Sequence, residues 1–526
     1  MSVQLIPITD EHAQYLHDET YTVGKASYIV FPKTEAEVIQ ALTEAWARDL
    51  PVTIQGARTG ISAGCVPLSG LILSLIRMTG VLGCRKLEDS NFAFRVHPGL
   101  PLSEFTKVVE HKRCSAAVDW DKESKTAWEE YLPAGDFFFS PDPTERTCSL
   151  GGMAACNASG ARSYLYGPIR SYVTAIRAVL PDGRAFSLRR GECVANGRKL
   201  KLELETGDII AITLPTYQMP KIKNTSGYYA TENMDAVDLF LGSDGTLAVI
   251  TELELKVIPM PAYIWGVLAF FRDEEAALDY VISVRDDRQR AAAIEYFDGE
   301  SLNILSSQKQ NNAAFAGLPA IPRSAEAAVY VELHDESEQA VTERILRLGD
   351  LMIMARGDIE DSLVARTESD RAALQFFRHA IPESVNSLIA MRKKTDPIIT
   401  KLGTDMAVPD RHLRHIMRYY RRELENAGLQ SGIWGHIGDN HLHVNILPNN
   451  GEEYRMGKEL FARWAAEVSS LGGTISSEHS VGKSKVGLLK IMYGDVFIEE
   501  MKAVKRALDP KGLLGQGTFF EREVLS

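Results

Sequence analysis

The pattern of hydrophobic positions between residues 28 and 56 predicts a strand, a helix and a second strand. The apolar runs at 28–31 and 51–55 have the length of short strands. Thr34 stands three residues before Glu37, the spacing of a capping box at a helix N-terminus. Between the runs, apolar residues recur with the spacing of one helix face: Val38, Ala41, Leu42 and Ala45. These elements predict a small βαβ unit that leads into a glycine-rich loop.

Farther along, the character of the sequence changes twice. Residues 56–183 are rich in Gly, Ser, Asn and Pro between short apolar runs, which is typical of backbone that lies against a ligand. From about residue 259 glycines become fewer, and helical patterns mix with strand patterns. After residue 471 glycine-rich loops return and precede an amphipathic helix at 496–507. We therefore predict three parts, residues 1–258, 259–470 and 471–526.

Composition and charge exclude several classes of protein. The chain has 526 residues, of which 45% are hydrophobic and 24% charged, so a folded globular protein is expected. Its net charge of −12 disfavours nucleic acid as a partner. The six cysteines form no CxxC pair, which argues against a zinc ribbon or an iron–sulfur cluster. With no signal peptide and no transmembrane run, we expect a cytoplasmic protein; peripheral contact with a membrane stays open.

Three glycine-rich loops are candidates for binding a cofactor. The first, at 56–64, follows a predicted strand and combines three glycines with Arg58, Thr59 and Ser62. Successive backbone N–H groups in such a loop can form a nest for a pyrophosphate, although the loop lacks the GxGxxG pattern of a Rossmann site. The second loop, at 141–167, and the third, at 241–246, have the same small residues. Ordinary turns and tight core packing are the alternative interpretations.

A cluster of histidines at 436–443 predicts a metal site. Residues 442–447 alternate as in a strand, so His441 and His443 should lie on one face. Glycines at 435 and 438 would let the chain double back and bring His436 near them. Glu478 could supply a carboxylate, and imidazoles with one carboxylate are typical of a catalytic divalent metal, with zinc expected first. The alternative is a set of structural, hydrogen-bonded histidines.

Other polar residues have the properties of a catalytic or substrate-binding group. His479 adjoins Glu478, and a neutral histidine is a suitable base at pH 7. Arg378 follows two phenylalanines, and Lys401 lies in a segment that ends at Asp405. Either cation could hold a substrate carboxylate. For the Glu478–His479 pair, an exposed surface loop is the alternative.

In this order, the motifs resemble the FAD-dependent D-2-hydroxyacid dehydrogenases, a group of the vanillyl-alcohol-oxidase-type flavoproteins that includes D-lactate, D-2-hydroxyglutarate and glycolate dehydrogenases. The resemblance covers about residues 25 to 520. It rests on the following segments: 56–64, 151–167, 242–246, His436-x-Gly438-Asp439 through Leu442-His443-x-Asn445, 472–475, Glu478-His479 and 508–510.

The resemblance implies an α+β fold with a two-subdomain, PCMH-type FAD-binding domain and a cap domain built on an antiparallel sheet. The last segment would return to close the flavin site. His436, His443 and Glu478 map onto the family's metal ligands, His479 onto its general base, and Arg378 and Lys401 onto carboxylate-binding positions. The implied cofactor-binding residues are Gly56, Arg58, Thr59, Gly60, Ser62, Gly64, Pro141, Ser149, Gly152, Asn157, Ser159, Gly160 and Ile250.

The chain departs from the family pattern at three places. The family usually has glycine and asparagine where this chain has Asn440 and His441, so His441 could be an extra ligand or a substrate contact. Ser480 stands where glycine is usual, and 515–518 replaces an Asn-Pro-Gly-Lys segment. No histidine occurs within 56–64, where some relatives attach FAD covalently, so non-covalent FAD is expected.

The expected function is therefore oxidation of a D-2-hydroxy acid, such as D-lactate, to the 2-keto acid. Hydride would pass to flavin N5, with a divalent metal (Zn or Mn) and the His479 base. Electrons would go to a separate acceptor: a cytochrome, a quinone, an electron-transfer flavoprotein or oxygen. Two alternatives are a subunit of a multi-protein flavin complex and a transferase like the alkylglycerone-phosphate synthases. A homodimer stays open.

Overall fold

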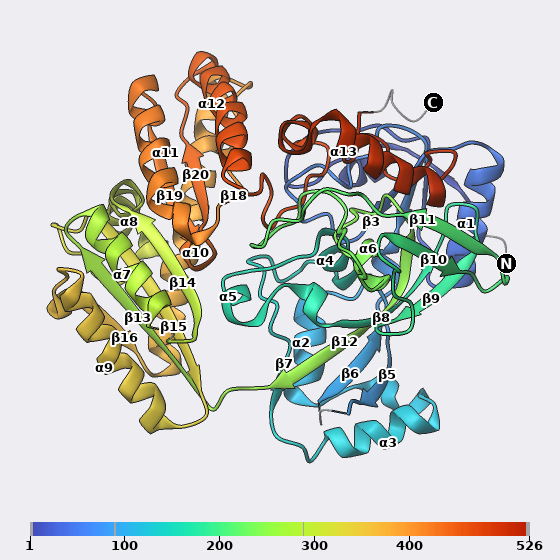
Figure 1. The fold of residues 1–526 in the computed structure, drawn as a ribbon, viewed down its shortest axis with the longest axis horizontal. Coiled ribbons are helices and arrows are strands. Elements are labelled where there is room, and N and C mark those ends of the chain that lie inside the picture. The colour runs from blue at the N-terminus through green and yellow to red at the C-terminus, as the bar shows by residue number, and fades with distance from the viewer. Residues whose placement is uncertain (1–3, 89–90, 288, 522–526) are drawn as a thin grey trace.

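The computed structural model describes residues 4–88, 91–287 and 289–521. Two sheet-based bodies are joined where β12 (Val249–Pro259) leads into β13 (Tyr263–Phe271), and Figure 1 shows this connection running between them. The C-terminal helix α13 (Val486–Leu508) returns to the first body. The first and last segments of the chain are therefore side by side.

The predicted βαβ unit is confirmed. Thr34 Oγ1 accepts a hydrogen bond from the Glu37 N–H at the start of α1, and the predicted helix face is buried. Both outer strands of the unit run parallel to β4, which lies between them. The strands of this sheet lie in the order β1 (Ile6–Pro7), β2 (Tyr28–Val30), β4 (Leu71–Ser74) and β3 (Val52–Gln55). The helix of the unit is α1 (Glu35–Ala47).

A second, antiparallel sheet completes the first body, with β12 at its centre. Phe137, Phe138 and Phe139 are buried, and β7 pairs with β12, so this aromatic run is core and not an exposed patch. The elements are β5 (Val81–Lys86), β6 (Phe92–Val96), β7 (Phe137–Phe138), β8 (Val173–Val179), β9 (Ala185–Arg189), the separate pair β10 (Lys199–Glu203) and β11 (Ile209–Thr213), and helices α2 (Leu102–His111), α3 (Lys122–Tyr131), α4 (Leu150–Cys156), α5 (Ser163–Tyr166) and α6 (Val237–Phe240).

The second body is built on an eight-stranded antiparallel sheet, as expected for the cap. Alternate residues of β13 enter different cores: Val267 packs with one cluster and Leu268 with the other. Helices cover both faces, so this strand reads as a continuous hydrophobic run. The strand order is β16 (Ser362–Ala365), β13, β15 (Ala327–Asp335), β14 (Ala291–Asp298), β19 (Ser431–His436), β20 (His441–Ile446) and β17 (Leu402–Gly403), with β18 (Met406–Ala407) also paired to β20.

Six helices surround this sheet. Most of them begin at a residue whose side chain accepts a hydrogen bond from a first-turn N–H, as at Asp273 and Ser337. The helices are α7 (Glu274–Asp286), α8 (Gly299–Asn311), α9 (Glu338–Met354), α10 (Glu368–Thr395), α11 (Leu413–Ala427) and α12 (Gly451–Ser470).

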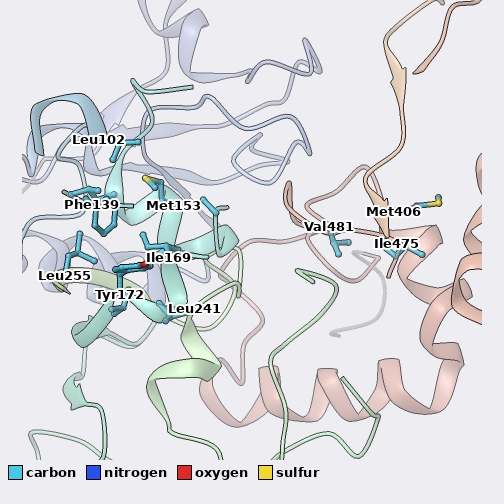
Figure 2. Packing of buried hydrophobic residues seen from close by; sticks show 14 of the residues in the cluster. Leu102, Phe139, Met153, Ile169, Tyr172, Leu241, Leu255, Met406, Ile475 and Val481 are labelled. Carbon is cyan, nitrogen blue, oxygen red and sulfur yellow. The ribbon is translucent and has the colours of Figure 1, made fainter. Parts of the chain in front are cut away.

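The last segment joins the two bodies. Val481 and Ile475 are buried, and Figure 2 shows them near Met406, apart from the core around Met153. Helix α13 is longer than the predicted 496–507 but breaks at Gly494, whose φ is +68°. Beyond it, the Val52 N–H donates to the Leu513 carbonyl over 2.8 Å. No helix within the described ranges is long and apolar enough to cross a membrane.

Candidate functional site

The three glycine-rich loops meet one another in the first body. The Gly242 N–H donates to the Ala154 carbonyl over 2.9 Å, which ties the third loop to the second. Ser149 joins the second loop to the first, because its Oγ accepts hydrogen bonds from Gly152 N–H and Ala57 N–H. A Cβ at Gly56 would lie 2.1 Å from Ser149 Oγ, so this approach requires glycine.

The middle of the second loop is helical, whereas the sequence predicted a glycine-rich loop throughout 141–167. Helix α4 begins after Ser149, whose side chain caps it, and ends at Asn157, which adopts φ +51°. A short helix of small residues lets the backbone pack closely: a Cβ at Gly151 would lie 2.5 Å from Pro98 Cβ. Gly151 of the Gly-Gly pair is therefore needed for packing of the helix, independently of any ligand.

The residues of these loops fit a polar cofactor. Buried Arg58 Nη1, Ser140 Oγ and Ser159 Oγ have no hydrogen-bond partner within the described part of the chain. A buried donor without a partner is unfavourable, so a bound phosphate or hydroxyl would satisfy these atoms. Gly60 faces open space, since nothing lies within 4 Å of a Cβ built there.

The other predicted cofactor residues lie around the same loops. Ser62 is buried, and its carbonyl accepts a hydrogen bond from the Lys483 N–H over 2.9 Å. Lys483 Nζ donates to the Gly64 carbonyl over 2.7 Å, so the last segment contacts the first loop. Thr59 is half-buried in the first loop, Asn157 lies at the end of α4, and Ile250 lies in β12. Pro141 and Gly160 are buried, and Gly160 packs against Asp142, the residue after Pro141.

In the second body, the predicted histidine hairpin is confirmed. Strands β19 and β20 pair antiparallel, and His436 lies opposite His441 in the register. The chain reverses through a 3-10 turn at Ile437–Asp439 and through Asn440, whose φ is +52°. Gly438 instead allows close packing, because a Cβ there would lie 2.9 Å from the Tyr164 ring.

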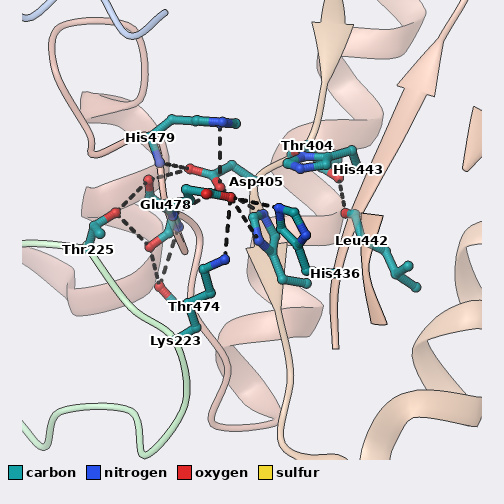
Figure 3. Close-up of polar contacts among 12 residues, drawn as sticks. Lys223, Thr225, Thr404, Asp405, His436, Leu442, His443, Thr474, Glu478 and His479 are labelled. Atoms are coloured by element: carbon teal, nitrogen blue, oxygen red, sulfur yellow. Dashed lines mark hydrogen bonds and ion pairs between the residues drawn. The ribbon is translucent and has the colours of Figure 1, made fainter. Parts of the chain in front are cut away.

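Four side chains of this region converge on one point. His436, His441, His443 and Glu478 each offer a ligand atom, and these atoms all lie within 4.8 Å of one another. Glu478 Oε2 is at the centre, 3.2 Å from His436 Nε2, 3.5 Å from His441 Nδ1 and 3.4 Å from Lys223 Nζ. Figure 3 shows Lys223 and His436 reaching toward this carboxylate. The cluster could hold a divalent metal.

The nitrogen of each imidazole that faces away from Glu478 has an oxygen atom close to it. Glu295 Oε1 is 2.7 Å from His436 Nδ1, and the Thr404 carbonyl is 3.0 Å from His443 Nδ1. Asp405 Oδ1 is 2.9 Å from His441 Nε2. Such partners fix the ring orientation of histidines that bind metals and keep the inner nitrogen available.

The electrostatics of the cluster favour neutral His441 and His443 beside a carboxylate, but not a neutral His436: burial opposes its charge, yet Glu295 and Glu478 raise the pKa of His436 to about 9. Burial lowers the pKa of His441 to about 4 and the pKa of His443 well below its usual value. Burial also opposes the charge on Glu478, but Lys223 and His436 outweigh it and hold the pKa of Glu478 well below 4.5. Neutral imidazole and ionised carboxylate are the forms that ligate metals.

Asp405 organises the loop that carries Glu478 and His479. Its carboxylate accepts hydrogen bonds from both of their N–H groups, over 3.1 and 3.0 Å. Lys485 Nζ donates to Asp405 Oδ2 over 2.6 Å. Burial disfavours the charge of Asp405, but Lys485 and His479 lower its pKa well below 3.8.

Ser480 adopts φ +58°, which explains why glycine is usual at this position. Its hydroxyl donates to Asp244 Oδ2 over 2.7 Å, and its N–H donates to Thr225 Oγ1. These bonds hold a left-handed backbone that a non-glycine residue rarely adopts. The departure from the family pattern is thus accommodated locally, and it adds a link between the third loop and the His479 loop.

The predicted base and the predicted carboxylate-binding residue Arg378 contact different members of the site, whereas the charge of Lys401 acts on His479. The His479 ring stacks on His443 with centroids 5.5 Å apart, and its Nδ1 is 3.6 Å from Asp405 Oδ1. Arg378 lies beside Glu295, whose Oε2 is 3.8 Å from its Nε, and Glu295 in turn contacts His436. Lys401 has part of its side chain exposed to solvent, but the protein around its ammonium group partly desolvates it and lowers its pKa to about 8.

Sequence reasoning did not assign Glu295, Asp405 or Lys223. Glu295 interrupts the apolar strand β14, and an acid within such a run is a recognisable pattern. Asp405 ends the segment that contains Lys401, but no local sequence pattern indicates a role for it. Lys223 lies in a loop with no motif at all, and only the folded chain brings it to Glu478.

Comparisons with known proteins agree with these observations. Residues 260–518 match the family described as FAD linked oxidases, C-terminal domain. Residues 26–127 and 123–189 match the FAD binding domain. The chain belongs to the FAD-linked oxidases. This family membership confirms the resemblance, and it makes the chain an oxidoreductase that binds FAD.

Curated relatives match this FAD-linked oxidase over nearly its whole length. A D-lactate dehydrogenase of Anaerostipes hadrus is 26% identical over 513 residues, covering 96% of this chain and 92% of the relative. The glycolate oxidase subunit GlcD of Bacillus subtilis (strain 168) is 25% identical over 504 residues, covering 94% and 89%.

Solved structures share its fold. A 4-ethylphenol oxidase of Gulosibacter chungangensis is similar with a TM-score of 0.64 at 16% identity, covering 98% of this chain and 94% of that one. An alkyldihydroxyacetonephosphate synthase is similar with a TM-score of 0.59 at 15% identity, covering 94% and 76%. The predicted α+β, PCMH-type fold is therefore confirmed.

Proposed function

We propose that this FAD-linked oxidase oxidises a D-2-hydroxy acid to the corresponding 2-keto acid. The observation that carries the proposal is the position of His479, between the carboxylate of Asp405 and the ring of His443. A base with a carboxylate behind it and a metal-ligand cluster beside it suits removal of a proton from a hydroxyl group. Relatives named as D-lactate dehydrogenase and glycolate oxidase subunit support this substrate class.

His436, His443 and Glu478 would hold a divalent metal, Zn²⁺ or Mn²⁺. Their chemistry fits, because a bound metal displaces the proton of His436, His443 is already neutral, and two imidazoles with a carboxylate leave positions for a substrate. When bound, the metal supplies positive charge that stabilises the oxygen of a deprotonated hydroxyl. Glu295 and the Thr404 carbonyl hold the two imidazoles in place.

His479 would accept the hydroxyl proton at Nε2. Its Nδ1 faces Asp405, so a proton on Nδ1 leaves the Nε2 lone pair free for the substrate. Burial is the main cause that lowers the pKa of His479, which keeps the base neutral at pH 7. Asp405 then stabilises the imidazolium that forms.

Arg378 and Lys401 would anchor the substrate carboxylate by charge-assisted hydrogen bonds. Fixing the carboxylate and the hydroxyl at two points determines which face of the carbon meets the flavin, and hence selectivity for the D-acid. The three glycine-rich loops would hold FAD, which would supply the two-electron oxidant for that carbon. A separate acceptor, such as a cytochrome, a quinone or an electron-transfer flavoprotein, would take the electrons.

An anaerobic absorption experiment tests the proposal. The purified FAD-loaded protein is mixed in turn with D-lactate, D-2-hydroxyglutarate, glycolate and L-lactate, and the flavin band is recorded. We expect at least one of the first three to bleach the band, and L-lactate to leave it unchanged. A flavin that stays oxidised with all of them would contradict the assigned substrate class.

A second candidate function is that of a subunit in a multi-protein flavin complex. The name of one relative, glycolate oxidase subunit GlcD, favours it. In that case the isolated chain would bind FAD without full turnover, and flavin reduction would require added partner proteins. Purification from its own cells with co-eluting iron–sulfur proteins would distinguish this candidate from an enzyme that acts alone.

Substrate capture should weaken as pH rises through the pKa of Lys401. This ammonium must be protonated to hold a carboxylate, and desolvation lowers its pKa to about 8. We therefore expect kcat/KM to fall above pH 8, because kcat/KM reports groups of the free enzyme. In Lys401→Arg, the guanidinium stays charged, so the fall should move beyond about pH 10. If kcat/KM of this variant still falls above pH 8 as in the wild type, Lys401 does not bind the substrate carboxylate.

A further inference from the structure

We propose that His441 is a fourth protein ligand to the metal, so that the site holds three imidazoles and one carboxylate. This inference rests on the proposed metal site at His436, His443 and Glu478. The family usually has asparagine at this position. For His441, the sequence left two possible roles open: an extra metal ligand or a contact to the substrate.

The backbone places His441 in the cluster. It lies on the same face of β20 as His443, and the centroids of the two rings are 4.5 Å apart. Its side chain is 0% exposed. A fully enclosed side chain behind His443 favours the role of a ligand over that of a substrate contact.

The two nitrogens of His441 repeat the arrangement of His436. In His436, Nδ1 contacts Glu295 and Nε2 faces Glu478. In His441, Nε2 lies 2.9 Å from Asp405, and Nδ1 faces Glu478 Oε2 at 3.5 Å. Each ring thus has one nitrogen beside an outer carboxylate and the other aimed at the same inner oxygen, as in a carboxylate–histidine–metal arrangement.

The inner atoms lack hydrogen bonds within the described ranges, although Lys223 Nζ approaches Glu478 Oε2 to 3.4 Å. Both ring nitrogens of His441 and Glu478 Oε2 are buried, and none of the three forms a hydrogen bond with another described residue, although His441 Nε2 lies 2.9 Å from Asp405 Oδ1. A neutral His441 with its proton on Nε2, toward Asp405, presents a lone pair at Nδ1 to the lone pairs of Glu478. Two buried acceptors that face each other are unfavourable, and a shared metal ion satisfies both.

A third imidazole changes which metal the site prefers. Nitrogen-rich sites suit Zn²⁺ and Co²⁺, whereas Mn²⁺ and Mg²⁺ prefer oxygen ligands. The asparagine usual in the family would offer oxygen at best. We therefore expect this chain to bind Zn²⁺ in preference to Mn²⁺, and His441 to be responsible for that preference.

The test compares metal binding by the FAD-loaded, full-length protein and two variants after removal of metal with a chelator. Zn²⁺ and Mn²⁺ are titrated by calorimetry, and X-ray absorption at the zinc edge counts imidazole ligands. For His441→Asn and His441→Gln we expect a loss of Zn²⁺ affinity of at least about 10- to 100-fold, a smaller preference over Mn²⁺, and two imidazoles in place of three. The control His415→Asn changes an exposed histidine of α11 and should bind as the wild type does.

Flavin content and thermal unfolding show whether each variant is folded. If folded His441→Asn or His441→Gln binds Zn²⁺ as tightly as the wild type, with the same imidazole count, the fourth-ligand proposal is wrong and the proposed function is unaffected. If the wild type binds neither ion, and Lys223 alone balances Glu478, both this inference and the proposed metal are overturned. If three imidazoles are found but no hydroxy acid bleaches the flavin, the inference stands and the proposed substrate class falls.

Discussion

Replacing His479 with alanine should lower kcat for the hydroxy acid by about 10² to 10⁴-fold, the usual contribution of a positioned general base. The flavin should stay bound, because the contacts of His479 are with Asp405 and the His443 ring and not with the glycine-rich loops. Stopped-flow measurement of flavin reduction separates this chemical step from substrate binding. We expect the reduction rate to fall much more than the apparent substrate affinity.

The matched control is His415→Ala, since His415 is exposed on α11 and pairs with Glu467. It should keep the wild-type rate. Because the pKa of His479 is lowered, the wild-type rate should fall only below about pH 6.5, where the imidazole becomes protonated. Flavin reduction at the wild-type rate in the His479→Ala variant would exclude His479 as the base.

Replacing Asp405 with asparagine should destabilise the protein by about 3–5 kcal/mol, the range found when one partner of a buried ion pair is removed. The change leaves the Lys485 ammonium without its carboxylate. It also replaces one of the two carboxylate oxygens that accept from the N–H groups of Glu478 and His479 with an NH₂ group, which cannot accept. Urea unfolding followed by circular dichroism measures the loss.

The pH dependence of this effect has a definite sign. The pKa of Asp405 is depressed in the folded protein, so its stabilisation is present above the unfolded pKa of about 3.9 and disappears as pH falls through the folded value. The destabilisation should therefore be full at neutral pH. The control Asp495→Asn alters an exposed pair with Lys490 and should leave the urea midpoint unchanged. Equal midpoints for Asp405→Asn and the wild type would contradict the central role of Asp405.

Features that depend on neighbouring residues were predictable from sequence. The βαβ unit follows from the periodicity of α1 and its Thr34 cap, and the hairpin of β19 and β20 follows from alternation around His441. The convergence of His436 and His443 is a consequence of the same register. The motif order was enough to indicate the family, because glycine loops and histidine spacing are read directly along the chain.

Features that depend on distant partners were not predictable in the same way. Helix α4 begins after Ser149, because the hydroxyl of Ser149 caps the Gly152 N–H. The glycine-rich composition of this segment does not distinguish such a helix from a loop. Glu295 and Asp405 act on the histidines from other strands and loops, 141 residues before His436 in the case of Glu295. Lys223 meets Glu478 across two bodies of the fold, and no local pattern encodes that meeting.

The contact between Lys483 and the first glycine loop also affects how the protein is made. Lys483 Nζ binds the carbonyl of Gly64, a residue 419 positions earlier in the chain. At a synthesis rate of about 5–20 residues per second, Gly64 leaves the ribosome about 20 to 80 seconds before its partner. The nascent first body therefore exposes its loops throughout that interval. Contacts of such long sequence separation also form late in refolding, so secondary structure should return before this closure does.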